Sequence, residues 1–343
     1  MDHNYADTVL DLHDIALLLN YERASTEPRF RHAKLREVAS PGDFKTVRLL
    51  TPAWTEAGAI PRVGFIFDKP LKPTRAEKDE PDLPTNMLPA SPSADLRKLT
   101  PKELETYFWQ ARNHDGCYRT VTLLQHFIDL FPEFTRVRVR TVENNTPRSY
   151  TTLANERLIV EMKLANPRSL SMSCVLPVNT TYITGGEPTM DHAVLGFSAP
   201  GSDIDTILDL SSLQFGDVGR GHKGRSLFVL EPVSQYLDRL NKYAERHNYY
   251  QAKISIRIND ALDNEWLKEV ALRTKLRWHN RVTDPWCGHC GAPSRGEPLK
   301  RCSKCQNAYY CNGDHQHAAW TFHKHFCNEP KAKNRLSLKT PSS

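Results

Sequence analysis

Helical patterns of apolar residues appear at four places between residues 100 and 276. Thr100-Pro101-Lys102-Glu103 has the form of a capping box with proline at the first helical position, so we expect a helix from there to about Arg112. A second helix should begin near Gly116, because apolar residues between Val121 and Phe131 form one stripe. Two more helices are expected at 233–246 and 262–276.

Alternating or short continuous apolar runs predict strands between and after these helices. The expected strands are 63–67, 137–139, 158–164, 191–197, 206–210, 227–230 and 253–258. The pattern is typical of an α+β fold, and we expect one mostly antiparallel sheet with helices on one side.

Proline and charge divide the chain into regions. We expect residues 1–67 to form an N-terminal helical region of unknown role, with one or two helices over 5–38. Six prolines among Lys, Glu and Asp make 68–95 a linker or loop. An α+β domain over 96–280 follows, and 328–343 is expected to be a disordered basic tail.

The composition is that of an ordinary globular protein, with 39% hydrophobic and 25% charged residues. The net charge of +6 is concentrated at the carboxyl end, because residues 281–343 hold ten Lys/Arg and four Asp/Glu. Basic residues scattered around a small domain are usually a solvated surface, so direct nucleic-acid binding is disfavoured.

The start of the chain has no features of a secretory signal. Met1-Asp2-His3-Asn4 lacks a basic start, and the apolar run Ile15 to Leu19 is too short to cross a bilayer. We therefore expect no membrane association and a reducing compartment, the cytoplasm or the nucleus.

Eight of the cysteine and histidine residues in 287–327 have the spacing of metal ligands. They are spaced as two Cys-x2-Cys pairs, one Cys-x3-His pair and one His-x3-Cys pair: Cys287, Cys290, Cys302, Cys305, Cys311, His315, His323 and Cys327. Zn²⁺ prefers four thiolate or imidazole ligands in tetrahedral geometry, so eight ligands suit two ions. Since no coordination position is left for water, both ions should be structural. Disulfides are disfavoured, because helix-spaced Cys/His mixtures do not suit cross-linking.

This segment resembles the MYND-type zinc finger. The resemblance includes Tyr309-Tyr310 before Cys311 and the spacing of Gln316 and Trp320, and it departs from the family at His315, where cysteine is usual. The family's cross-braced topology implies two ligand sets. They are Cys287, Cys290, Cys311 and His315, and Cys302, Cys305, His323 and Cys327. Spacing alone also permits sequential pairing, and His317 is an alternative to His315.

The MYND resemblance also implies a function. It favours a protein-protein interaction module that binds a protein or peptide partner, often one containing proline, near Gln316 and Trp320.

A second group of residues suggests an enzyme. Cys117 stands at a helix start, whose positive end would favour a thiolate. If 199–202 form a hairpin turn, His192 lies directly opposite Asp209 on the neighbouring strand, where a carboxylate could orient the imidazole.

Residues 113–231 resemble, more weakly, transglutaminase-like and papain-like cysteine enzymes, which use Cys, His and Asp in this order. The resemblance implies a cysteine hydrolase or acyl transferase in which Cys117 attacks an acyl carbon and His192 transfers the proton. Asp209 would orient the imidazole of His192. The structural alternative is a buried cysteine, a core histidine and a turn aspartate. The sequence does not decide between them.

Overall fold

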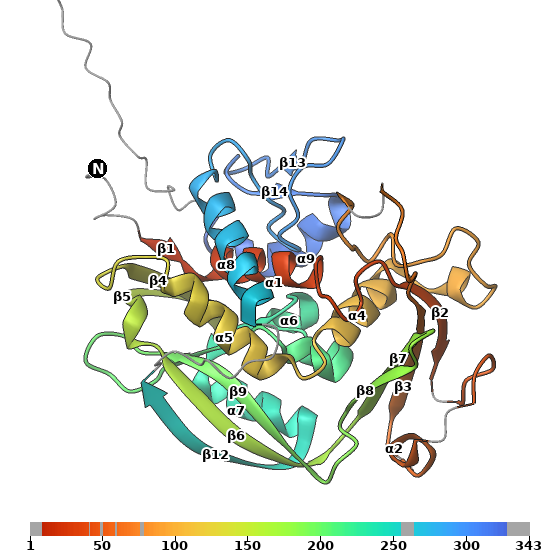
Figure 1. Ribbon diagram of the computed structural model, residues 1–343. Coiled ribbons are helices and arrows are strands. Elements are labelled where there is room, and N and C mark those ends of the chain that lie inside the picture. Colours follow the sequence, from red (N-terminus) through yellow and green to blue (C-terminus); the bar gives the residue numbers. More distant parts are fainter. Residues whose placement is uncertain are drawn as a thin grey trace, which may run out of the picture.

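The computed structural model describes residues 9–40, 42–48, 51–58, 60–75, 79–254 and 264–327. The described residues have an α+β fold in which several separate sheets lie around a central group of helices, with a small C-terminal region at the top of Figure 1. The predicted tail at 328–343 lies outside the described residues, as does most of the strand predicted at 253–258.

The helices are α1 Leu12–Ala24, α2 Pro52–Thr55, α4 Pro101–Arg112, α5 Gly116–Ile128, α6 His222–Arg225, α7 Val233–Tyr243, α8 Asn264–His279 and α9 Gly313–His323. The strands are β1 Leu10–Asp11, β2 Lys34–Ala39, β3 Arg62–Asp68, β4 Arg136–Glu143, β5 Thr146–Leu153, β6 Leu158–Pro167, β7 Leu170–Leu176, β8 Thr180–Thr184, β9 Thr189–Phe197, β10 Thr206–Asp209, β11 Val229–Pro232, β12 Ala244–Ile254, β13 Lys300–Arg301 and β14 Tyr309–Tyr310.

The largest sheet has five antiparallel strands in the order β11-β10-β9-β6-β12. Helices cover both of its faces, so the prediction of helices on one side was wrong. Leu195 of β9 belongs to the core that α5 shares, whereas Val194 packs in a cluster with Tyr236 and Leu240 of α7. The reason is that most residues of β9 and all residues of β10 are buried, on both faces of the sheet, and each face needs its own cover.

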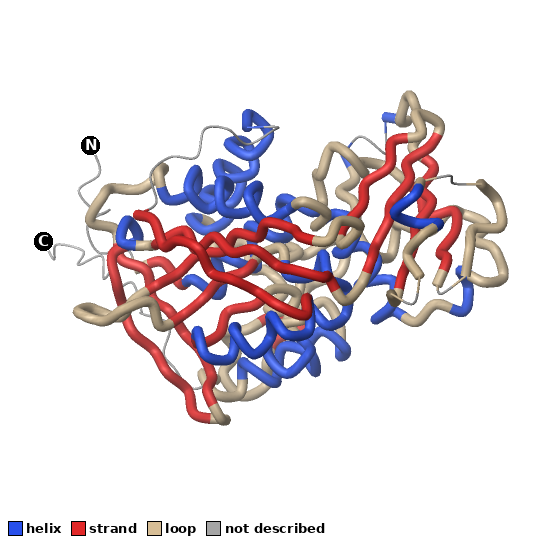
Figure 2. The backbone as a smooth tube through the Cα atoms, turned by 90° about the horizontal axis from the view of Figure 1, so that it is seen from below, coloured by secondary structure: helices blue, strands red, loops and turns tan. Residues whose placement is uncertain are grey.

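Two smaller sheets accompany the first, so the prediction of one sheet was also wrong. They have the orders β2-β3-β7-β8 and β1-β4-β5, and Figure 2 shows the former set to one side. Residues 34–39 form strand β2 and not the expected helix, because they pair with β3 from Lys34 opposite Asp68 to Ala39 opposite Gly64. Similarly, α7 ends at Tyr243, and β12 continues beside β6.

Helix α1 is buried almost all round and forms the centre of the main core. Its side chains from Leu12 to Leu19 pack with those of α5 and α8. Asp11 caps the helix by accepting a hydrogen bond from the amide of Asp14 at 3.2 Å. No helix among the described residues is long and apolar enough to span a membrane.

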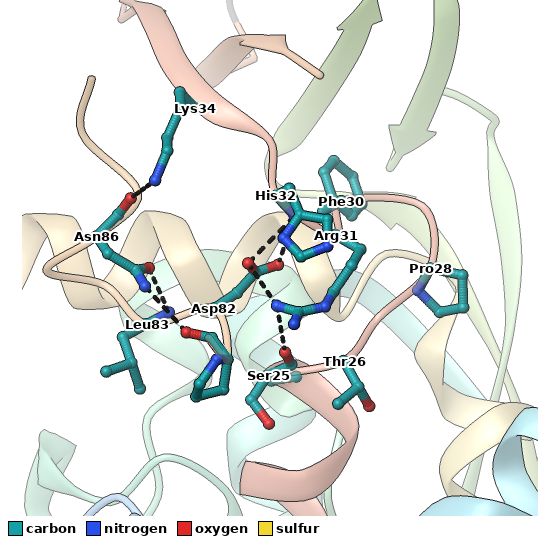
Figure 3. A network of polar contacts seen from close by, with 12 residues as sticks. Ser25, Thr26, Pro28, Phe30, Arg31, His32, Lys34, Asp82, Leu83 and Asn86 are labelled. Carbon is teal, nitrogen blue, oxygen red and sulfur yellow. Dashed lines mark hydrogen bonds and ion pairs between the residues drawn. The ribbon is translucent and has the colours of Figure 1, made fainter. Parts of the chain in front are cut away.

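The proline-rich segment is anchored at Asp82, which is buried (Figure 3). The Asp82 carboxylate accepts hydrogen bonds from the backbone amide of His32 at 3.1 Å and from Arg31 at 3.0 Å. It also accepts one from the fully buried Arg112 of α4 at 3.2 Å. Because a buried guanidinium is costly without a partner, this loop contributes to the packing around α4.

Candidate metal centre

The two halves of the C-terminal region are built from short local structures. Strands β13 and β14 form a small hairpin, with Arg301 opposite Tyr309. Helix α9 then begins after Asn312, whose side-chain oxygen accepts a hydrogen bond from the amide of His315 at 2.8 Å. The helix therefore carries His315 in its first turn and His323 at its last residue.

Four of the predicted ligands meet in one cluster: Cys287, Cys290, Cys311 and His315. Their ligand atoms all lie within 4.8 Å of one another. The Cys287 Sγ is 3.3 Å from His315 Nδ1, and the Cys290 and Cys311 sulfurs are 3.8 Å apart. His315 occupies the fourth corner, whereas His317 is exposed.

The other four meet in a second cluster: Cys302, Cys305, His323 and Cys327. The sulfurs of Cys302 and Cys327 are 3.9 Å apart, and Cys305 Sγ is 3.4 Å from His323 Nε2. Each cluster thus combines an early Cys-x2-Cys pair with a later pair from around α9. This arrangement is cross-braced and not sequential.

Both donor sets fit a zinc ion. A tetrahedral ion with Zn–S bonds of about 2.3 Å separates two sulfurs by about 3.8 Å, and sulfur from nitrogen by slightly less. The observed spacings agree with this geometry. Three thiolates and one imidazole fill each coordination shell, so the two clusters fit two structural zinc ions.

A carboxylate from outside the region lies beside the first cluster, and the sequence did not indicate it. Glu105 of α4 has Oε1 2.9 Å from His289 Nε2 and 4.0 Å from His315 Nε2. Its other oxygen is 2.9 Å from Arg220. Burial raises the pKa of Glu105, but His289, Arg220 and His315 outweigh it and lower the pKa to about 2.

The C-terminal region is docked on α1 and α8. Gly291 has φ +77°, and a Cβ there would lie 2.4 Å from the carbonyl oxygen of Leu17, so glycine permits this close approach. Arg277 of α8 donates to the Gly291 carbonyl at 2.8 Å, and Arg295 donates to the Tyr21 hydroxyl at 2.6 Å. These contacts fix the first knuckle against the main core.

A cavity of about 610 Å³ lies along the docking seam, which is the contact between the C-terminal region and the main core. Aromatic side chains from both sides line it, among them Trp278, Trp286, Tyr309, Phe322 and Phe326. Within the seam, the ring of Phe322 stacks on that of His13 with centroids 4.3 Å apart.

The structure also brings His192 and Asp209 together, although not in the expected register. Strands β9 and β10 pair with Leu208 opposite Leu195, which is shifted by two residues from the predicted alignment. An even shift leaves both side chains on the same face of the sheet. His192 Nε2 is 3.0 Å from Asp209 Oδ2, and Cys117 is the second residue of α5.

This polar group is buried and densely hydrogen-bonded. His192 is 0% exposed, Asp209 1% and Cys117 4%. Tyr236 donates to Asp209 Oδ2 at 3.0 Å, and Ser211 donates to Oδ1 through its amide and its hydroxyl. Burial lowers the pKa of His192, but the carboxylate of Asp209 and the contact with Cys117 raise it to about 10.

Comparison with known proteins identifies the C-terminal region. Residues 287–327 match the family model of the MYND finger. This match confirms the resemblance seen in the sequence, and it describes the finger alone. A comparison with curated proteins found no match, and a comparison with solved structures found none.

The first prediction concerns zinc stoichiometry. Elemental analysis of the purified protein should find two zinc ions per chain, since each cluster offers four ligands. Cys305→Ser should lose about one ion and part of the finger's fold, because zinc binding and folding are coupled in so small a region. Cys174→Ala, which removes a buried cysteine of β7, should retain both ions. One ion in the wild type, or disulfides in place of metal, would contradict the assignment.

The second prediction concerns pH. An unfolded histidine has a pKa near 6.5, so between that pH and about 10 folded His192 keeps a proton that the unfolded chain has lost. Its contribution to the free energy of unfolding should therefore be complete below pH 6.5 and fall as pH rises, by up to about 1.4 kcal/mol per pH unit. Denaturant unfolding of the zinc-saturated proteins measures this contribution. The free energies of unfolding of wild type and His192→Gln should approach each other between pH 6.5 and 10. A difference in free energy of unfolding that stays constant with pH would contradict the raised pKa of His192.

Proposed function

We propose that this protein acts mainly as a protein-protein interaction module that captures a partner through its MYND finger. The partner is a protein or peptide, with proline in the contacted segment, and it binds near Gln316 and Trp320. We expect this to take place where thiols stay reduced, in the cytoplasm or the nucleus.

The observation that carries the proposal is the exposure of Trp320 on a helix positioned by both clusters. The indole is 38% exposed on α9, and Gln316 lies one turn earlier on the same side of the helix. His315 and His323 tie the two ends of α9 to different clusters. The helix is therefore presented as a rigid surface, which limits the entropy lost on binding.

An exposed indole suits proline. The ring of proline offers apolar area without a backbone N–H donor, and a polyproline segment is already extended before it binds. Gln316 adds an amide that can hydrogen-bond the exposed carbonyls of such a segment. The finger thus supplies one apolar and one polar contact on the same face of α9.

The third prediction tests this surface. Trp320→Ala should weaken partner capture by about 2 kcal/mol, roughly 30-fold in Kd, because large aromatic side chains commonly dominate small interfaces. Zinc content should stay at two ions, since the indole is not a ligand. The measurement is titration of the zinc-loaded protein with a proline-containing peptide recovered by selection against the finger.

Two controls accompany that titration. Phe134→Ala removes a 61% exposed aromatic far from the finger in sequence and should leave Kd unchanged. A peptide with proline replaced by alanine should bind more weakly. Unchanged capture by Trp320→Ala, with capture lost on deletion of 287–327, would place the partner elsewhere on the finger, for which the aromatic cavity along the docking seam is the next surface to test.

A second candidate, a cysteine hydrolase or acyl transferase, is favoured by one observation. Cys117 at the start of α5 contacts His192, which is paired with Asp209. The finger would then serve as a targeting module. The deep burial of all three side chains favours the structural role instead, because a substrate must reach the sulfur.

The fourth prediction separates these roles. In a working site, Cys117 of the zinc-saturated full chain should be alkylated by iodoacetamide at pH 6 to 7 much faster than the buried Cys174, because the thiolate is the reactive form. His192→Gln should slow the reaction at Cys117. Peptide mass mapping reads out each site. Equally slow alkylation of both cysteines would contradict the enzyme candidate, and the interaction module would be the only proposed function that remains.

A further inference from the structure

Glu105 lies against the first zinc cluster although it is 184 residues from His289 in the sequence. It projects from α4, and its side chain is 13% exposed. One carboxylate oxygen contacts two imidazoles, those of His289 and His315, while the other contacts Arg220. The two imidazole rings meet edge to face, with centroids 4.8 Å apart.

The orientation of His315 makes this carboxylate relevant to the metal. Nδ1 of His315 points into the cluster, 3.3 Å from Cys287 Sγ, so Nε2 is the nitrogen that faces Glu105. An imidazole that binds a metal through one nitrogen carries a proton on the other. At 4.0 Å the Glu105 oxygen is too far away for a direct hydrogen bond, but its negative charge attracts that N–H, which favours this ring orientation and strengthens the imidazole as a ligand.

His289 extends the effect to the thiolates. It stands between Cys287 and Cys290 in the first knuckle, and its hydrogen bond to Glu105 is 2.9 Å long. The same carboxylate therefore hydrogen-bonds the turn that carries two cysteine ligands and lies 4.0 Å from the histidine ligand.

We propose that Glu105 is the outer carboxylate of the first zinc site, orienting His315 and the Cys287–Cys290 knuckle. The affinity of this site for zinc then depends on the docking of the finger onto α4. This inference does not depend on the partner surface, because it concerns only metal retention.

A purely structural role for Glu105 makes a different prediction. Glu105 also neutralises Arg220, whose other partners include Asp217 at 3.0 Å and the hydroxyl of Thr106 at 2.9 Å. If Glu105 serves only to hold Arg220, then Asp217→Asn should weaken zinc binding in the same way as Glu105→Gln. If Glu105 acts on the ligands, Asp217→Asn should leave both zinc sites unchanged.

The fifth prediction uses a readout that distinguishes the two sites. Zinc-loaded full-length protein is challenged with increasing chelator, pulsed with N-ethylmaleimide and mapped by peptide mass spectrometry. Labelling reports the first cluster through Cys287, Cys290 and Cys311, and the second through Cys302, Cys305 and Cys327. Glu105→Gln should lower the zinc affinity of the first cluster by about 10- to 100-fold and leave the second unchanged.

A further control removes one of the two proposed targets. His315→Cys replaces the imidazole with a thiolate that has no second nitrogen, so adding Glu105→Gln to it should cause a smaller loss, the part that is transmitted through His289 and the Cys287–Cys290 knuckle. The proposal would be overturned if Glu105→Gln released zinc equally from both clusters or left the zinc affinity of the first cluster unchanged. It would also be overturned if Asp217→Asn lowered the zinc affinity of the first cluster as much as Glu105→Gln. The Asp217→Asn comparison decides the matter even if His315→Cys does not retain zinc.

Discussion

The finger depends on gathering four ligands around each of two ions. A segment of 41 residues cannot bury enough apolar surface to fold alone, and the described finger has a small core made largely of the ligand cysteines and Tyr310. Metal coordination replaces that missing core. Because the second Cys-x2-Cys pair shares its ion with His323 and Cys327, and the first shares its ion with Cys311 and His315, the two halves are interlocked.

The finger is also integrated with the rest of the chain. Its first knuckle packs on α1 through Gly291, and α9 reaches the main domain through Phe322 and through a hydrogen bond from His222 to the Thr321 carbonyl at 3.1 Å. Residues where the finger meets the rest of the chain line the aromatic cavity and form the Glu105 contact. Zinc binding, docking and the orientation of Trp320 are thereby parts of one arrangement.

The polar group around His192 imposes a second constraint, in the middle of the largest sheet. Buried charge is tolerated only when it is paired, and Asp209 is surrounded by the imidazole, the Tyr236 hydroxyl and two donors from Ser211. Such a network joins β9, β10 and α7 and can specify their alignment. The same geometry resembles a catalytic pair, which is why accessibility of Cys117, and not the presence of the pair, separates the two roles.

Features that are local, or that depend on residue type alone, could be predicted from the amino-acid sequence. Ligand spacing identified two zinc sites, the Thr100 capping box placed the start of α4, and apolar runs located β3, β4, β6, β9, β10 and β11. How these elements pack together became visible only in the folded chain. Alternation reveals which face of a strand is buried but not what covers it, so the division into separate sheets and the two-residue register shift at β10 could not be read from the pattern. Glu105 gave no signal either, because its partners lie far away in the chain and come together only when the finger packs against α4.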